Sequence, residues 1–458
     1  MARSAVWKPA HRPAGKPASR KTGRMQGMVD EQGVGSERVV ADHSRSLTSH
    51  WIALTLVAAS VSAAPWAMSR LGFRGFVATY AFAVAAWPFA RRVSLKTSTI
   101  IIIALALRLP MMIHPPLLSG DVYRYLADGS ALASGHNPYT TPSSDPRVNH
   151  REIPTIYPPH AEALFALVHQ LPLWRLLLIG CDVAVLMMLP APARLGYALL
   201  PPAVLEGAWS GHLDLVAGML LLLAWKRRSG SAAALAVGMK VIPLAAVPAI
   251  WAQSARRRFV LLFLAILLIP AIPFFLAGPV MPGMSSYATR WIFNSPAYDL
   301  VRSLIELLPL ARWWTAIKDP LHLEAISNLV YRHLFADFLT RAVLGVLALA
   351  LLARFWRRPV ASIGILLLCA PAIHPWYWLS AAPLALVREK AWIAFALCAP
   401  FSYLLYAGAG KSLVFGLCYG LPLAITLARL RLSASESSDA EWPGAAARSG
   451  TAPETSRL

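Results

Sequence analysis

The chain alternates between long apolar runs and short polar connections over most of its length. A run of about 20 apolar residues is long enough to cross a bilayer as a helix. We therefore predict about twelve membrane-spanning helices. They fall at roughly 51–68, 73–90, 97–113, 173–190, 195–210, 212–225, 259–276, 337–353, 360–373, 377–387, 391–406 and 412–428.

One further apolar run is predicted not to cross the membrane. Residues 231–253, "SAAALAVGMKVIPLAAVPAIWAQ", are long enough to span but carry a basic cluster at each end. A full crossing would move every later basic cluster to the opposite side. We expect a re-entrant or broken helix interrupted at Pro243 and Pro248, because irregular backbone at membrane depth is tolerated where protein surrounds it. An ordinary span with one misplaced cluster is the alternative.

The basic clusters between the apolar runs set the orientation, because short cytoplasmic loops carry an excess of lysine and arginine. With a cytosolic N-terminus, these clusters all lie inside: 91–92, 226–228, 256–258, 357–358, 388–390 and 429–431. Two long segments, about 114–172 and 277–336, then lie outside. The prediction is a multi-pass protein of the bacterial inner membrane, with both termini in the cytoplasm and an extracytoplasmic working surface.

Both ends of the chain lack a periodic apolar pattern and are rich in charged and small residues. Such segments cannot bury enough apolar surface to fold. We expect a basic disordered cytosolic tail at 1–48, a polytopic domain at 49–432 and a disordered C-terminal tail at 433–458.

Composition agrees with an all-α integral membrane protein. Of the 458 residues, 57% are hydrophobic and only 14% are charged, and the mean hydropathy is +0.52. The net charge of +21 comes mainly from the N-terminal tail and the loop clusters. Since no basic groove with interleaved aromatic residues is present, nucleic acid is not an expected partner. The four cysteines lie in apolar runs without metal-ligand spacing and are expected to be buried.

A polar stretch, "SGDVYRYLADGSALASGHNPY" at 119–139, follows the third apolar run. Asp121 lies just beyond the predicted span, so its carboxylate is expected near the outer membrane surface. Asp128 lies two helical turns later and shares a face with Asp121. A capping acid in an aromatic belt would explain the pattern without any chemistry. The functional hypothesis is a general base that meets a substrate arriving from the membrane.

Five motifs occur in a characteristic order. They are "GDVYRYLADGSALASGHNPY", "EIPTIYPPHAEALFAL" (152–167), "LEGAWSGHLDLVAGMLLLLAW" (205–225), "GMKVIPLAAVPAI" (238–250) and "HPWYWL" (374–379). Their order and spacing resemble those of glycosyltransferase family 87 and related bacterial polyprenyl-phosphate-mannose-dependent mannosyltransferases, within the C-type glycosyltransferase superfamily. The resemblance covers about 97–390.

The resemblance implies a hexosyltransferase that takes a sugar from a polyprenyl-phosphate donor, with an acidic catalytic residue in the first large outer loop. That residue would be Asp121. In the superfamily's inverting mechanism, Asp121 would take the proton of an acceptor hydroxyl as it displaces polyprenyl phosphate. The acceptor would be a cell-envelope glycan or glycolipid, no cofactor is implied, and mannose as the sugar rests on the resemblance alone.

The candidates for binding substrate come from all five motifs and from the second long loop. They are Tyr123, Arg124, Tyr125, Asp128, Asn137, Tyr139, Tyr157, His212, Asp214, Lys240, Arg290, His374, Trp376 and Tyr377. Arg124 and Arg290 are candidates for holding the leaving phosphate, since fixed positive charge stabilises a developing anion. The aromatic residues either stack on sugar rings or form an interfacial belt.

Three polar residues leave alternatives open. His212 and Asp214 are expected to orient each other or to hold sugar hydroxyls, or simply to end helices at the interface. Together with His374 they offer too few ligands for a metal site, and no metal is predicted, although a divalent cation stays an alternative. Lys240 within an apolar run is costly and therefore indicates function. Its expected depth, in the cytosolic half, makes it a binding candidate only.

The rival class is a polytopic transporter or a lipid or glycolipid flippase, which would share the spans, Lys240 and the broken helix. No internal repeat is visible, and the two long outer loops carry clustered acids, tyrosines and arginines. Both features favour the enzyme. A structural subunit would show no dependence on Asp121.

Overall fold

A computed structural model describes residues 30–428. The chain divides into two compact units, residues 1–49 and 50–458, and the second carries all features discussed below. The C-terminal tail expected at 433–458 and residues 1–29 of the N-terminal tail lie outside the described residues. Residues 30–48, expected as part of that tail, are helical, because a helix nucleated in the following apolar run propagates at little cost.

The described residues form helices and no strand, which confirms the all-α prediction. The first half contains these elements in order: α1 (Asp30–Ala90), α2 (Thr97–Arg108), η1 (Leu109–Ile113), α3 (Asp121–Ala133), α4 (Pro159–Leu167), α5 (Leu171–Met188), α6 (Ala191–Ala198), η2 (Ala203–Trp209), α7 (Asp214–Arg227), α8 (Gly230–Met239), η3 (Ile242–Ala246) and α9 (Val247–Trp251).

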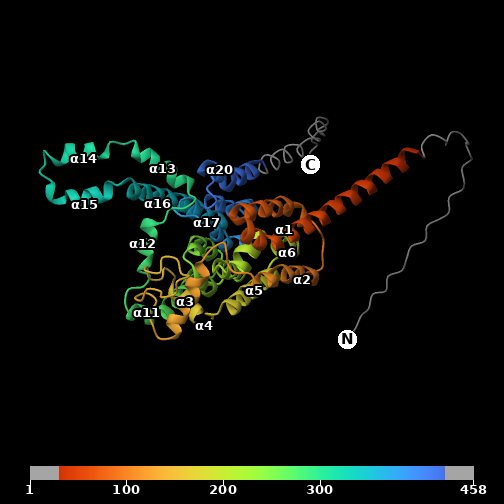
Figure 1. Cartoon of the computed structure of the whole chain (residues 1–458), viewed down its shortest axis with the longest axis horizontal. Helices are drawn as coiled ribbons and strands as arrows, with labels where there is room; N and C mark the ends of the chain where they lie inside the picture. The colour runs from red at the N-terminus through yellow and green to blue at the C-terminus, as the bar shows by residue number, and fades with distance from the viewer. Residues whose placement is uncertain (1–29, 429–458) are drawn as a thin grey trace, which may run out of the picture. The chain divides into compact units, whose positions relative to one another are not determined.

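The second half continues with more short helices (Figure 1). Its elements are α10 (Arg256–Leu268), η4 (Ile269–Ala271), α11 (Ile272–Leu276), α12 (Gly283–Arg290), α13 (Pro296–Glu306), α14 (Leu310–Lys318), α15 (Glu324–Leu334), α16 (Ala336–Phe355), α17 (Pro359–Leu368), η5 (Pro375–Ser380), α18 (Ala382–Ala385), η6 (Lys390–Trp392), α19 (Ile393–Cys398), η7 (Ala399–Leu405), α20 (Lys411–Phe415) and η8 (Gly416–Gly420).

The expected count of about twelve spans is not confirmed. By length and composition, five helices of the described residues could cross a membrane: Thr48–Ala90, Leu171–Met188, Arg256–Leu276, Ala336–Phe355 and Lys411–Ala428. Ala203–Trp209 and Asp214–Arg227, bent by 116° at their junction, would make a sixth if they form one span. Other runs expected to span are shorter helices. α17 and α19 are almost entirely buried, so their apolar composition reflects protein neighbours as well as lipid.

Two breaks in helices have local causes. Gly72 interrupts α1 with φ 64° and ψ −159°, a conformation that only glycine adopts readily, and it separates the runs expected at 51–68 and 73–90. The segment expected to be broken at Pro243 and Pro248 is instead broken at Lys240, whose backbone is extended. The two prolines lie in the first turns of η3 and α9, where proline is tolerated.

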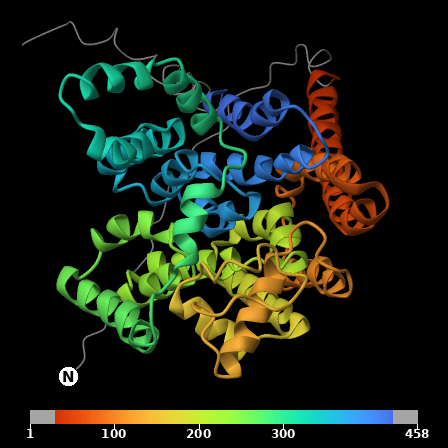
Figure 2. The same cartoon turned by 60° about the vertical axis from the view of Figure 1, so that its left-hand side comes forward.

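Close packing fixes the helices that carry the site. α3 lies side by side with α4, and a Cβ atom added at Gly129 would lie 2.2 Å from the carbonyl oxygen of Phe165. α12 packs as closely on the loop between α3 and α4, since a Cβ atom at Gly283 would lie 2.1 Å from the carbonyl oxygen of Pro154. In Figures 1 and 2, α12 lies between α11 and the helices α13–α16.

Candidate functional site

A cavity of about 1070 Å³ lies between α3, the 149–158 loop, the break after α8, α12, α16 and η5. Its polar and aromatic lining consists of Ser119, Asp121, Arg124, Asn149, His150, Tyr157, Lys240, Tyr287, Trp291, Arg341, His374, Trp376, Tyr377 and Tyr406. Its apolar lining includes Phe73, Leu117, Ile153, Ile156, Val241, Ile242, Met284, Leu344, Ala348, Leu366 and Leu367. The volume is at the upper end of the range for small-molecule sites.

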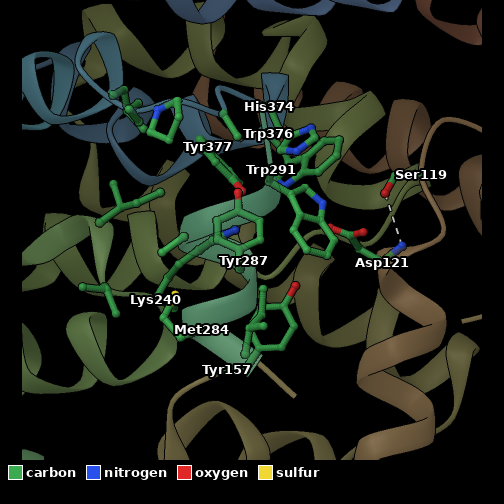
Figure 3. Close-up of a pocket in the computed structure, with 18 of the residues that line it drawn as sticks. Ser119, Asp121, Tyr157, Lys240, Met284, Tyr287, Trp291, His374, Trp376 and Tyr377 are labelled. Atoms are coloured by element: carbon green, nitrogen blue, oxygen red, sulfur yellow. Dashed lines mark hydrogen bonds between the residues drawn. The ribbon is translucent and has the colours of Figure 1, made fainter. Parts of the chain in front are cut away.

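Asp121 is the first residue of α3 and lines this cavity (Figure 3). Its backbone N–H donates to Ser119 Oγ at 3.2 Å, which fixes the start of the helix. Burial raises the pKa of Asp121 above its ordinary value, and the charge of Lys240 opposes part of that shift. The carboxylate therefore combines access to the cavity with increased basicity, as a general base requires.

Lys240, which we expected in the cytosolic half of the membrane, lines the same cavity as Asp121. Its ammonium group donates to Asp214 Oδ2 at 2.6 Å and lies 4.4 Å from the centroid of the Tyr377 ring. Ser380 donates to the other carboxylate oxygen, Asp214 Oδ1, at 3.2 Å. The Asp214 side chain is fully enclosed, whereas that of Lys240 is 13% exposed. Of this pair, Lys240 is the member that a ligand in the cavity can reach.

α12 contributes aromatic residues that the sequence patterns did not identify. The hydroxyl of Tyr287 is hydrogen-bonded to that of Tyr377, which joins α12 to η5 across the cavity. Trp291 follows α12 and stands edge-on to His150, with ring centroids 4.7 Å apart. Figure 3 shows Tyr287, Trp291 and Tyr377 around the same space as Asp121.

Arg341 in α16 was also missed, because it lies in an apolar run without any motif. Its guanidinium group donates to the carbonyl oxygens of Ala288 and Thr289 at 2.6 and 2.9 Å. These carbonyls belong to the last turn of α12. Arg341 therefore attaches α12 to α16 and adds positive charge to the cavity wall.

Arg124 lines the cavity, but its guanidinium group is hydrogen-bonded to the loop that follows α3. It donates to the carbonyl oxygens of Ile153, Asn149 and His150 at 3.0, 3.0 and 2.8 Å. The geometry makes Arg124 a support for this loop, and fewer of its N–H groups remain for a phosphate.

The "HPWYW" motif forms a stack of rings at the cavity wall. Trp376 stacks on His374 and His212, with centroid distances of 4.5 and 4.0 Å. Because both imidazoles cover the indole ring, Trp376 has little free surface for a sugar. We expected His212 and Asp214 to orient each other, but the structure pairs each of them with another residue. His212 lies 3.6 Å from Glu206 Oε2, while Asp214 pairs with Lys240.

Several candidate residues do not line the cavity. Tyr125 is buried against the rings of Tyr157, Phe165 and Trp174, so its role is packing. Asp128 is buried 3.9 Å from Arg124, and burial raises its pKa to about 6. The sequence spacing puts Asp128 on the same helix face as Asp121, but only the first turn of α3 lines the cavity.

The remaining candidates lie in the loop or at its edges. Asn137 Oδ1 accepts the N–H of Tyr139 at 3.0 Å, and the Tyr139 hydroxyl donates to the Tyr157 carbonyl oxygen at 2.7 Å. The guanidinium group of Arg147 lies over the ring of Tyr123, 4.6 Å from the ring centroid. Arg290 is exposed at the end of α12 and does not line the cavity. Tyr157, His374, Trp376 and Tyr377 do line it.

Within residues 30–428, no group of three His, Cys, Asp or Glu side chains is arranged to hold a metal ion. The charges that face the cavity are instead the carboxylate of Asp121 and the cations of Lys240, Arg124 and Arg341. This set suits proton abstraction together with binding of an anion.

Comparison with known families identifies one match. Residues 33–158 match the model of the alpha-(1->6)-mannopyranosyltransferase N-terminal domain. Curated proteins and solved structures gave no match. The matched segment includes Asp121, Arg124 and Tyr157, three of the residues that line the cavity. Together with the apolar helices, this match supports a membrane mannosyltransferase.

Proposed function

We propose that this chain is a mannosyltransferase that takes its sugar from a polyprenyl-phosphate donor and transfers it to a hydroxyl of a cell-envelope glycan or glycolipid. The observation that carries the proposal is the cavity. It joins a carboxylate of raised pKa, a mostly buried lysine and an apolar wall on a helix apolar enough to span the membrane. An amphipathic phosphate donor needs the cation and the apolar wall, and its acceptor needs the base.

Asp121 is the general base in this proposal. Its carboxylate takes the proton of the acceptor hydroxyl while the hydroxyl oxygen bonds to the anomeric carbon. The bond between that carbon and the phosphate oxygen breaks, and its electron pair leaves with polyprenyl phosphate. A single displacement inverts the anomeric configuration, and phosphate departs without a general acid. Base catalysis of this kind contributes a factor of about 10² to 10⁴.

Lys240 is the cation that best fits the leaving phosphate. Its ammonium group reaches the cavity and has two donor positions beyond the one that it gives to Asp214. Arg124 already serves the loop carbonyls, and Arg290 lies outside the cavity. A fixed, mostly buried cation stabilises a developing anion more strongly than an exposed one.

The apolar wall fits the polyprenyl chain. Leu344 and Ala348 of α16 and Leu366 and Leu367 of α17 line the cavity. Beside them, Gly345 leaves open space, since an added Cβ atom would meet no atom within 4 Å. Because α16 is long and apolar enough to span, this wall offers lipid a route into the cavity. In the bacterial inner membrane the site would face the extracytoplasmic side.

Purified protein in lipid nanodiscs tests the proposal. Radiolabelled polyprenyl-phosphate mannose, its glucose and galactose counterparts and GDP-mannose are offered with mannoside acceptors, with and without EDTA. We expect transfer from the lipid-linked mannose alone, unaffected by EDTA. Transfer from GDP-mannose only would overturn the choice of donor. In sealed proteoliposomes, movement of the lipid donor between the leaflets without transfer would indicate a flippase.

A further inference from the structure

The helices α13, α14 and α15, residues 296–334, form an arm between α12 and α16 (Figures 1 and 2). The arm exposes many large apolar side chains, and contact between such side chains and water is unfavourable. They are Leu300, Leu304, Leu307, Leu308, Trp313, Ile317, Leu321 and Ile326. So many exposed large apolar residues in one segment indicate a partner.

The exposed apolar residues of α13 and α14 fall on one face of each helix. Leu300 and Leu304 in α13 and Leu307 just beyond it follow helical spacing, and in α14 so do Trp313 and Ile317. Arg312 and Thr315 lie on the other side of α14. These two helices of the arm are therefore amphipathic.

The position of the arm in the chain indicates which partner covers this face. α15 ends at Leu334, and α16, which is apolar and long enough to span, begins two residues later at Ala336. The end of a spanning helix lies at a membrane surface, so the arm begins at that depth. Phe335 and Phe338 at this junction are 64% and 46% exposed.

We propose that the arm lies in the membrane interface with its apolar face among the acyl chains. The partner is the lipid bilayer itself, and no particular headgroup is needed. The charges of the arm are largely balanced within the protein, since Arg302 pairs with Glu306 at 2.8 Å and Lys318 with Asp319 at 3.1 Å. Apolar burial therefore drives the contact.

The arm is also attached to the cavity wall. The Tyr298 hydroxyl of α13 donates to Asp337 Oδ1 of α16 at 2.9 Å, and the Arg341 guanidinium lies 5.2 Å from the Tyr298 ring centroid. Arg341 in turn holds the last turn of α12. An arm held in the interface would fix the depth of α12, and with it the depth of the cavity.

Depth-dependent fluorescence quenching tests this inference without any measurement of activity. Two variants, Ile317→Cys on the apolar face and Thr315→Cys on the polar face, each carry an NBD label in a Cys369→Ala background. The other three cysteines are buried. The full chain is reconstituted in phosphatidylcholine vesicles, with doxyl-labelled lipid or aqueous iodide as quencher.

We expect the label at position 317 to emit at shorter wavelength and to be quenched several-fold more by doxyl lipid than the label at position 315. Iodide should show the reverse order. The difference should persist in high salt, because it depends on apolar contact. Equal quenching by iodide at both positions would place the arm in water. Protection of position 317 from both quenchers would mean that protein covers the face. Either result overturns the inference.

Discussion

Two of the ion pairs among residues 30–428, Arg108 with Asp182 and Lys240 with Asp214, differ in what else they touch. Arg108 and Asp182 are 2.7 Å apart, and both side chains are fully enclosed. Arg108 also donates to the carbonyl oxygen of Ala198 at 2.9 Å, and the Tyr197 hydroxyl donates to Asp182. Lys240 and Asp214 are as close, at 2.6 Å, but Lys240 borders the cavity.

The difference separates a structural pair from a candidate functional one. The hydrogen-bond partners of the Arg108 pair belong to the packed helices α2, α5 and α6, so the pair holds these helices together. The Lys240 pair has one member at the surface of a large cavity that also contains Asp121. A buried ion pair indicates function only where a ligand can reach it.

Removal of Arg108 should have the largest effect on stability. Arg108→Met leaves the Asp182 carboxylate buried without its partner, and breaking such a pair costs about 3 to 5 kcal/mol. Thermal unfolding in nanodiscs measures the loss. The double variant Arg108→Met with Asp182→Leu should regain most of it and keep transferase activity. Loss of activity in a stable double variant would contradict the structural role.

Removal of the Lys240 charge should act on activity instead. In Lys240→Gln the amide can still donate to Asp214, so the loss of stability should be smaller than in Arg108→Met. Loss of a hydrogen bond to a charged group costs about 1.5 to 3 kcal/mol, which corresponds to a fall in kcat/KM of about 10- to 150-fold. Lys226→Gln is the control, since Lys226 is a lysine of α7 away from the cavity. Equal kcat/KM in both variants would remove Lys240 from the site.

The pH dependence of transfer should show the smallest effect. Asp121 acts as a base only when ionised, and burial raises its pKa. Activity should therefore fall as the pH is lowered, tenfold per unit below the raised pKa, and the fall should begin above the range of an ordinary aspartate. The profile of kcat/KM against pH measures this. An acid limb at the ordinary aspartate pKa would argue against a buried base.

Local sequence patterns predicted the parts of the site that depend on nearby residues. The polar stretch after the third apolar run singled out Asp121, which is the first residue of α3 and lines the cavity. The motifs around Tyr157, Lys240 and His374 also contribute to the cavity. In each of these cases a polar or aromatic group in an apolar context was the signal.

Tertiary contacts determined what the sequence could not predict. Tyr287 and Arg341 carry no motif and reach the cavity through the packing of α12 on α16. Apolar runs such as 391–406 were expected to span, yet their helices are enclosed by protein. Hydropathy reports that a segment avoids water, and it does not distinguish lipid from protein as the neighbour.

The most direct test of the account is the rate of mannose transfer from polyprenyl-phosphate mannose by Asp121→Asn beside wild type, with thermal unfolding of both proteins. We predict equal stability, because the amide has nearly the same shape, and a rate lower by a factor of about 10² to 10⁴. An equally stable variant that transfers mannose at the wild-type rate would contradict the assignment of this cavity as the active site.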